Sequence, residues 1–174
     1  MDSRAISEEL ARGLRVIQAL LSIMTQDEAR IKPDAESWSA LEVICHLVDE
    51  EREDFRKHIQ QAFSNPQEVW HPIDPQGWVA DRHYQTQLLD AKAAEFRQER
   101  EKSLRWLNDM HATDWECKIA APFGDISAGT LLAAWATHDN LHIRQLVEIR
   151  QAILEMKSKP LSTRYAGEDR KSVV

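Results

Sequence analysis

The sequence is poor in glycine and contains no long apolar run. Only five of its 174 residues are glycine, so long segments lack this helix breaker. No apolar run approaches the roughly 20 residues that a membrane-spanning helix needs. Residues 1–30 are charged and amphipathic, and they lack the apolar core of a signal peptide. These absences predict a protein that does not enter a membrane and, by default, a cytoplasmic location.

Cysteine and positive charge are also in short supply. The two cysteines, Cys45 and Cys117, lie far apart and form no C-x-x-C pair. This spacing argues against a disulfide framework and is compatible with a reducing compartment. The net charge of −7 argues against binding to a nucleic-acid backbone. The chain length fits one globular domain spanning residues 1–174.

Four segments carry apolar residues at the three- and four-residue spacing of an amphipathic helix. They cover roughly residues 3–29, 39–63, 83–111 and 127–157. Ser39 and Glu42 have the spacing of a capping box, in which each side chain bonds to the backbone N–H of the other residue. The second helix is therefore expected to begin at Ser39.

The connections between these segments predict the topology. Residues 64–82 form a long irregular connector, which is unusual unless it crosses the bundle or helps to form a site. Residues 112–126 form a shorter loop without a convincing strand pattern, and the tail over about 158–174 is polar. We therefore expect an all-α four-helix bundle with parallel second and third helices, the up-down-down-up arrangement.

Two histidines stand out in the apolar stripe of the last helix. His138 and His142 are four residues apart, which places both imidazoles on one helical face with Cβ atoms about 5–6 Å apart. Together they can hold one divalent metal ion, and a third imidazole would leave the open fourth position of a catalytic zinc site. Two core histidines satisfied by neighbouring groups are the alternative. Spacing alone does not select His46 over His58 or His83 as the third ligand.

The motifs around these histidines resemble those of the DinB-like superfamily. That pattern has a tryptophan and a serine before the second helix and then a His-Leu pair followed by acidic residues. A His-Asp-x-x-His segment with a nearby glutamine lies in the last helix. The matching residues here are Trp38, Ser39, His46, Leu47, Asp49, Glu50, His138, Asp139, His142 and Gln145.

The resemblance implies both a fold and a site. The fold is a four-helix bundle, and the site is one divalent ion, zinc or nickel, held by His46, His138 and His142. Characterised relatives include S-transferases that use a low-molecular-weight thiol, and many others are described only as metal-dependent hydrolases. The resemblance therefore implies a metal-dependent enzyme of one of these two kinds, acting on a small-molecule substrate. A low-molecular-weight thiol is a candidate second cofactor.

Two acidic residues are candidate catalytic groups. Glu50 follows His46 by four residues, and Asp139 lies between the two histidines of the last helix. Either carboxylate can act as a general base or hold a ligand ring in place. The alternative to an enzyme is a non-catalytic helical module for binding or dimerisation, with a structural metal or none.

A second apolar row on the last helix bears on assembly. Its members are Leu132, Ala136, Ile143 and Val147. A helix that is apolar on more than one face must bury the extra face somewhere. The loops could cover it, or a second subunit could, most simply in a two-fold homodimer. The sequence favours the homodimer, and the family resemblance points the same way.

Overall fold

The fold is a bundle of long helices with one short hairpin at its end. The computed structural model describes residues 2–110 and 114–167. Its elements are α1 (Ser3–Ser22), α2 (Gln26–Ala29), α3 (Ala40–Glu53), α4 (Phe55–Ser64), α5 (Pro75–Asp81), the 3₁₀ turn η1 (Tyr84–Thr86), α6 (Leu89–Asp109), β1 (Lys118–Ala121), β2 (Gly124–Ser127), α7 (Ala128–Ser158) and the 3₁₀ turn η2 (Arg164–Ala166). Part of the predicted polar tail, residues 168–174, lies outside the described ranges.

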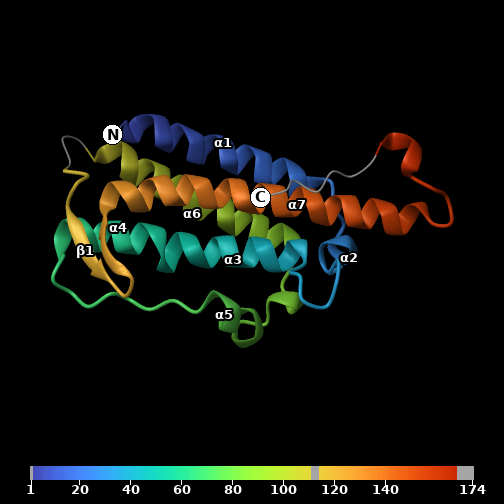
Figure 1. The fold of residues 1–174 in the computed structure, drawn as a ribbon, viewed down its shortest axis with the longest axis horizontal. Coiled ribbons are helices and arrows are strands. Elements are labelled where there is room, and N and C mark those ends of the chain that lie inside the picture. The colour runs from blue at the N-terminus through green and yellow to red at the C-terminus, as the bar shows by residue number, and fades with distance from the viewer. Residues whose placement is uncertain (1, 111–113, 168–174) are drawn as a thin grey trace.

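The long helices have the predicted up-down-down-up arrangement. In Figure 1, α1 and α7 run in one direction, whereas the consecutive helices α3 and α4 and the helix α6 run in the other. The residue numbers of contacting pairs increase together along the two helical segments, because Glu51 of α3 pairs with Arg100 of α6 and Arg56 of α4 reaches Ser103 of α6. The two central helices are therefore parallel, and the prediction of an all-α four-helix bundle is confirmed.

The connection over residues 65–88 returns along the bundle and makes this parallel pairing possible (Figure 1). Two of its side chains bind to acidic residues of α3. The hydroxyl of Tyr84 donates a 2.5 Å hydrogen bond to Asp49, and Arg82 pairs with Asp49 at 2.9 Å and with Glu53 at 2.6 Å. Arg82 also lies 4.1 Å above the ring of Trp78, which is buried. The connection thus covers the side of α3 that carries Asp49 and Glu53.

The connector predicted to be irregular over residues 64–82 contains the short helix α5, which begins with a cap at Asp74 and a proline. The bounds of the predicted helices differ in three places, because local capping and backbone geometry interrupt the apolar periodicity. The first helix ends at Ser22, and a capping box at Thr25 starts the separate helix α2. The second helix breaks at Asp54, where φ is −115° and ψ is −94°. The third begins at residue 89 instead of 83, since His83 has the left-handed φ of 50°.

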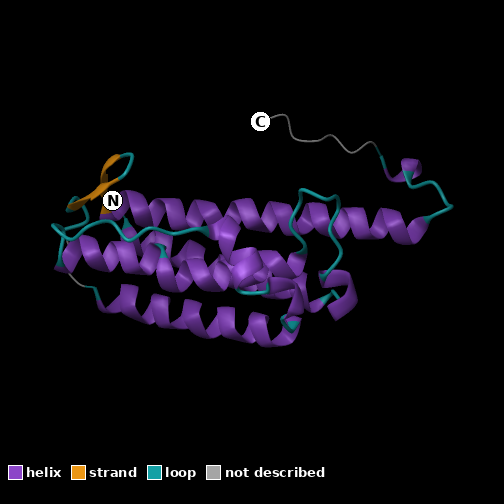
Figure 2. Cartoon of the chain, turned by 90° about the horizontal axis from the view of Figure 1, so that it is seen from below, coloured by secondary structure: helices purple, strands orange, loops and turns teal. Residues whose placement is uncertain are grey.

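The loop predicted over 112–126 contains an antiparallel hairpin of β1 and β2, with Lys118 opposite Ser127. Each strand has four residues, and Ile119 is the buried side chain on β1. A strand this short gives too few alternations for a pattern of period two to be recognised in the sequence. Figure 2 shows the hairpin at the opposite end of the bundle from the projecting last turns of α7.

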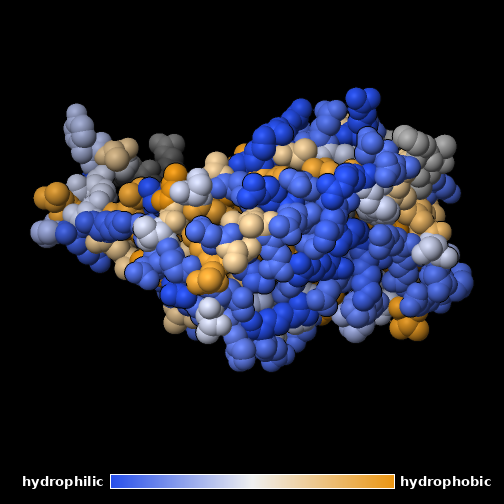
Figure 3. Space-filling view, turned by 180° about the vertical axis from the view of Figure 1, so that it is seen from behind, coloured by the Kyte–Doolittle hydropathy of each residue, from blue (hydrophilic) through white to orange (hydrophobic). Residues whose placement is uncertain are grey.

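Two apolar clusters fill the bundle. One is packed around α3 and includes Ile44, Phe96 and Ile149, and the other is packed around α4 and includes Ile59 and Trp135. Helix α7 contributes to both, so it is held along most of the bundle. Seen from behind, the surface is mainly hydrophilic, and apolar side chains gather toward the end where α7 projects (Figure 3). Within the described ranges, no helix is long and apolar enough to cross a membrane.

Candidate metal centre

The start of α3 positions the first histidine. Ser39 caps the helix by accepting a hydrogen bond from the backbone of Glu42, and the carboxylate of Glu42 accepts one from the backbone of Ser39. This capping box fixes where the helix begins, and His46 then lies two turns further on, buried at 4% exposure. The ring of Trp38, just before the cap, lies 4.8 Å from His46 and stacks on His142 at 6.4 Å between centroids.

The three predicted ligands meet between α3 and α7. The Nε2 atom of His138 lies 3.3 Å from Nε2 of His46 and 3.1 Å from Nε2 of His142. One ring nitrogen from each residue lies within 4.8 Å of the other two. Two nitrogens bound about 2.0–2.1 Å from a tetrahedral zinc ion would lie about 3.3 Å apart. The spacing of the rings therefore matches that of metal ligands.

The environment keeps these imidazoles neutral. Burial lowers the pKa of His46 to about 2 and that of His138 to about 3, and the neighbouring histidines add to the effect. Burial also lowers the pKa of His142. Metal coordination needs the unprotonated ring nitrogen. At neutral pH the three rings are thus in the form that binds a cation.

The donor set fits a divalent cation better than it fits mutual hydrogen bonding. The Nδ1 atom of His142 lies 2.8 Å from Oε1 of Gln145, which assigns the proton to Nδ1 and leaves the Nε2 lone pair directed at the other rings. Nδ1 of His46 and of His138 is buried without a hydrogen-bond partner in the described part of the chain. With a proton on each Nδ1, the three Nε2 atoms would face one another as acceptors and could not hydrogen-bond, whereas a single cation would satisfy them together.

Glu50, one of the two predicted catalytic residues, lies beside this group. Its Oε1 atom is 3.6 Å from Nδ1 of His46. Burial raises the pKa of Glu50 to about 9, and its hydrogen bond with Asp54 adds to the rise. Asp54 in turn lies 2.6 Å from Nδ1 of His58, a fully buried side chain. Three polar side chains, Glu50, Asp54 and His58, therefore lie in sequence at the break between α3 and α4, beginning next to His46.

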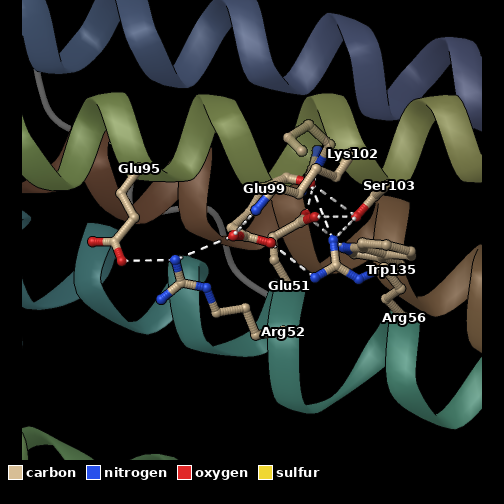
Figure 4. A network of polar contacts seen from close by, with 9 residues as sticks. Glu51, Arg52, Arg56, Glu95, Glu99, Lys102, Ser103 and Trp135 are labelled. Carbon is tan, nitrogen blue, oxygen red and sulfur yellow. Dashed lines mark hydrogen bonds and ion pairs between the residues drawn. The ribbon is translucent and has the colours of Figure 1, made fainter.

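The structure places Asp139, the other predicted catalytic residue, elsewhere. Its side chain is buried at 3% exposure, and both oxygens accept hydrogen bonds from Arg100 of α6, at 2.5 and 2.8 Å. It belongs to a buried polar network that also includes Glu51 and Trp135, part of which Figure 4 shows between α3, α6 and α7. The two candidates that flank the histidines in sequence are thus separated in space.

Sequence reasoning named Gln145 as part of the motif but missed its contact with His142, and it missed other residues around the site. Gln145 stands three residues after His142, a spacing that could have signalled its hydrogen bond. Arg100 and Glu51 have no comparable signal, because each resembles an ordinary charged residue on an amphipathic helix. Trp38, which belongs to the motif, lines a cavity of about 490 Å³ together with residues of the connection between α4 and α6, including Gln76.

Comparisons with known proteins agree with this geometry. The family model of the DinB superfamily matches residues 9–146. A similar solved structure is that of YfiT from Bacillus subtilis, described as a probable metal-dependent hydrolase with an unusual four-helix bundle topology. It shares 14% sequence identity and a TM-score of 0.77, over 86% of each chain. At this identity the match demonstrates a common fold. No curated protein sequence matches the chain.

Proposed function

The chain belongs to the DinB superfamily, and on that premise we propose that it is a metal-dependent enzyme whose ion is held by His46, His138 and His142. One observation carries the proposal: the Nε2 atoms of three neutral rings converge with separations of 3.1 and 3.3 Å. Zinc and nickel are the ions that we expect, because imidazole nitrogen suits both. Three protein ligands would leave a further coordination position for a reactant.

The surrounding residues have definable tasks in this proposal. Gln145 holds the ring of His142 through Nδ1, which keeps Nε2 directed at the ion. Glu50 lies 3.6 Å from Nδ1 of His46 and is placed to restrain that ring. Trp38 packs against two of the ligands and limits the access of water from its side. When bound, the ion would supply a Lewis acid that lowers the pKa of a coordinated water or thiol.

Two reactions are compatible with this site. Hydrolysis is the first candidate, supported by the description of the structurally similar YfiT as a probable metal-dependent hydrolase. Transfer of a low-molecular-weight thiol is the second, supported by the motif resemblance and by the neutral ligand set, which leaves the full positive charge of an ion to stabilise a thiolate. In both cases we propose a small-molecule substrate, and the cavity beside Trp38 is a candidate for its binding.

The test begins with metal analysis of the protein purified without added metal. We expect about one zinc or nickel ion per chain. Esters, amides and phosphoesters would then be assayed for hydrolysis, and small thiols with electrophilic acceptors would be assayed for transfer. Any activity should disappear in His138→Ala. Metal-free protein that fails to bind added zinc or nickel would overturn the proposal and favour a non-catalytic binding module.

A further inference from the structure

A buried arginine joins all four long helices of the bundle. Arg100 of α6 is 0% exposed, and its guanidinium donates to the backbone oxygen of Leu10 on α1 at 3.0 Å. It also donates to Glu51 on α3 at 2.5 Å and to both oxygens of Asp139 on α7. A planar guanidinium held by a two-pronged carboxylate contact has a defined orientation. Each of the other three helices is therefore fixed relative to the same rigid group.

The anchors on α7 lie on both sides of a predicted metal ligand. Asp139 directly follows His138, and Trp135 precedes it by three residues. The indole N–H of Trp135 donates to Oε1 of Glu51 at 3.1 Å, and Glu51 Oε2 accepts from the hydroxyl of Ser103 (Figure 4). Within one turn of α7, two polar contacts thus fix its rotation relative to α3 and α6. Successive helical residues point about 100° apart, so a small rotation of α7 would move its histidines away from His46.

The packing of α1 is adapted to this contact. Gly13 faces Asp139, and a Cβ atom at Gly13 would lie 2.5 Å from Oδ2 of Asp139. A side chain at this position would have to displace the carboxylate, because this distance is shorter than ordinary van der Waals packing allows. The close approach of α1 to the Arg100–Asp139 pair therefore depends on glycine at this position.

We propose that Arg100 is a positioning residue for the histidine site, acting through Asp139 and Glu51. The inference rests on the proposed metal site. It holds that the contacts of Arg100 and Glu51 with α7 set the rotation of this helix about its axis. Buried ion pairs contribute little net stability in many proteins, but they can select one packing arrangement over others. Here the selected arrangement is the one in which His138 and His142 face His46. Asp139 thereby serves the site without touching the reactants.

The decisive variant is Arg100→Lys, which keeps the charge but cannot form the planar two-pronged contact. Arg52→Lys is the matched control, because Arg52 of α3 pairs with Glu95 and Glu99 of α6 and so joins these two helices outside the group formed by Arg100, Glu51 and Asp139. Urea unfolding reports stability, and titration with cobalt(II) reports affinity and ligand geometry through its absorption spectrum. We expect Arg100→Lys to fold and to bind cobalt about 10- to 100-fold more weakly, with an altered spectrum. Arg52→Lys should keep the affinity of the original protein.

A second measurement separates this inference from the metal proposal. In metal-free protein, the imidazole ¹⁵N signals of the three histidines should shift in Arg100→Lys and remain in place in Arg52→Lys. If the original protein binds no cobalt, the metal proposal fails, while the imidazole signals still decide the positioning role. Unchanged affinity and unchanged signals in a folded Arg100→Lys protein would overturn it. If that variant does not fold, Asp139→Asn decides by the same criteria, and failure of both to fold would show a role in folding instead.

Discussion

The Nε2 atoms of His46 and His138 lie 3.3 Å apart although 92 positions separate these residues in the sequence. This proximity depends on the antiparallel contact of α3 and α7, the two helices that carry the three histidines. On the adjoining helix α4, Phe55 stacks on Trp135 of α7 at 5.6 Å, and the ring of Phe55 lies 5.2 Å from that of His138. The histidines are therefore part of a packed interface, which prepares their geometry before any ion binds.

The first prediction concerns the ligands. His138→Ala or His142→Ala should abolish binding of the divalent ion and leave the helical content nearly unchanged, because two apolar clusters hold the bundle together. Metal analysis after dialysis and circular dichroism measure the two effects separately. His83→Asn is the control, since asparagine tolerates the left-handed backbone at φ 50° and His83 lies outside the group. Global unfolding of both alanine variants would instead indicate that the two histidines have a structural role.

The second prediction concerns the pH dependence of stability in metal-free protein. Because burial raises the pKa of Glu50 from 4.5 to about 9, the folded state holds a proton that the unfolded chain has released over this range. The free energy of unfolding should therefore carry a Glu50 contribution that falls as the pH rises from about 5 toward 9. Glu50→Gln mimics the protonated side chain and cannot titrate. Its free energy of unfolding, relative to that of the original protein, should therefore increase with pH.

Urea unfolding at pH 5, 6, 7 and 8 measures this growth. Glu101→Gln, at an exposed position on α6, provides the control for the chemical substitution. The comparison between Glu50→Gln and the original protein removes contributions common to both, including those of the three histidines. A stability difference that stays constant across the series would contradict the proposed proton on Glu50.

The third prediction concerns the cap that begins α3. Ser39 is fully buried, and its hydroxyl accepts hydrogen bonds from the backbone of Glu42 and from the side chain of Gln85 at 2.8 Å. Ser39→Ala should lower the free energy of unfolding by about 1–2 kcal/mol, the usual cost of losing such a cap. Ser22→Ala, at an exposed site in α1, should cost less. Equal effects of the two substitutions would show that the cap does not stabilise α3.

The sequence was sufficient to predict the four long helical segments, because the burial of their residues follows a regular period, but not the short helices α2 and α5. The same regularity explains why His138 and His142 were recognised as one face of α7. His46 could not be selected by spacing, since its partners lie on another helix and tertiary packing decides which histidine faces them. The family motif supplied that choice, and the observed spacing of the rings is compatible with it.

The polar network was beyond prediction for a different reason. On its own helix, Arg100 looks like any of several surface arginines, and its burial follows from three carboxylate and carbonyl groups on other helices. The break at Asp54 was missed as well, because the apolar stripe continues across it from Val48 to Phe55 and Ile59. Pairwise contacts between distant segments have no periodic signature in the chain.

The last prediction concerns assembly and the second apolar row of α7. Leu132 is buried within the chain, but Val147 is 50% exposed, and Leu154, two turns further along the same face of α7, is 43% exposed. The described loops therefore leave part of this row uncovered, and we expect a homodimer that buries it. Light scattering at micromolar concentration should give about twice the chain mass of 20.1 kDa. Val147→Glu should yield monomers, since burying an unpaired charge is costly. Val69 lies on the connection between α4 and α6 and is 87% exposed, so Val69→Glu should leave the dimer intact. A mass of one chain for the original protein would show that the homodimer prediction is wrong.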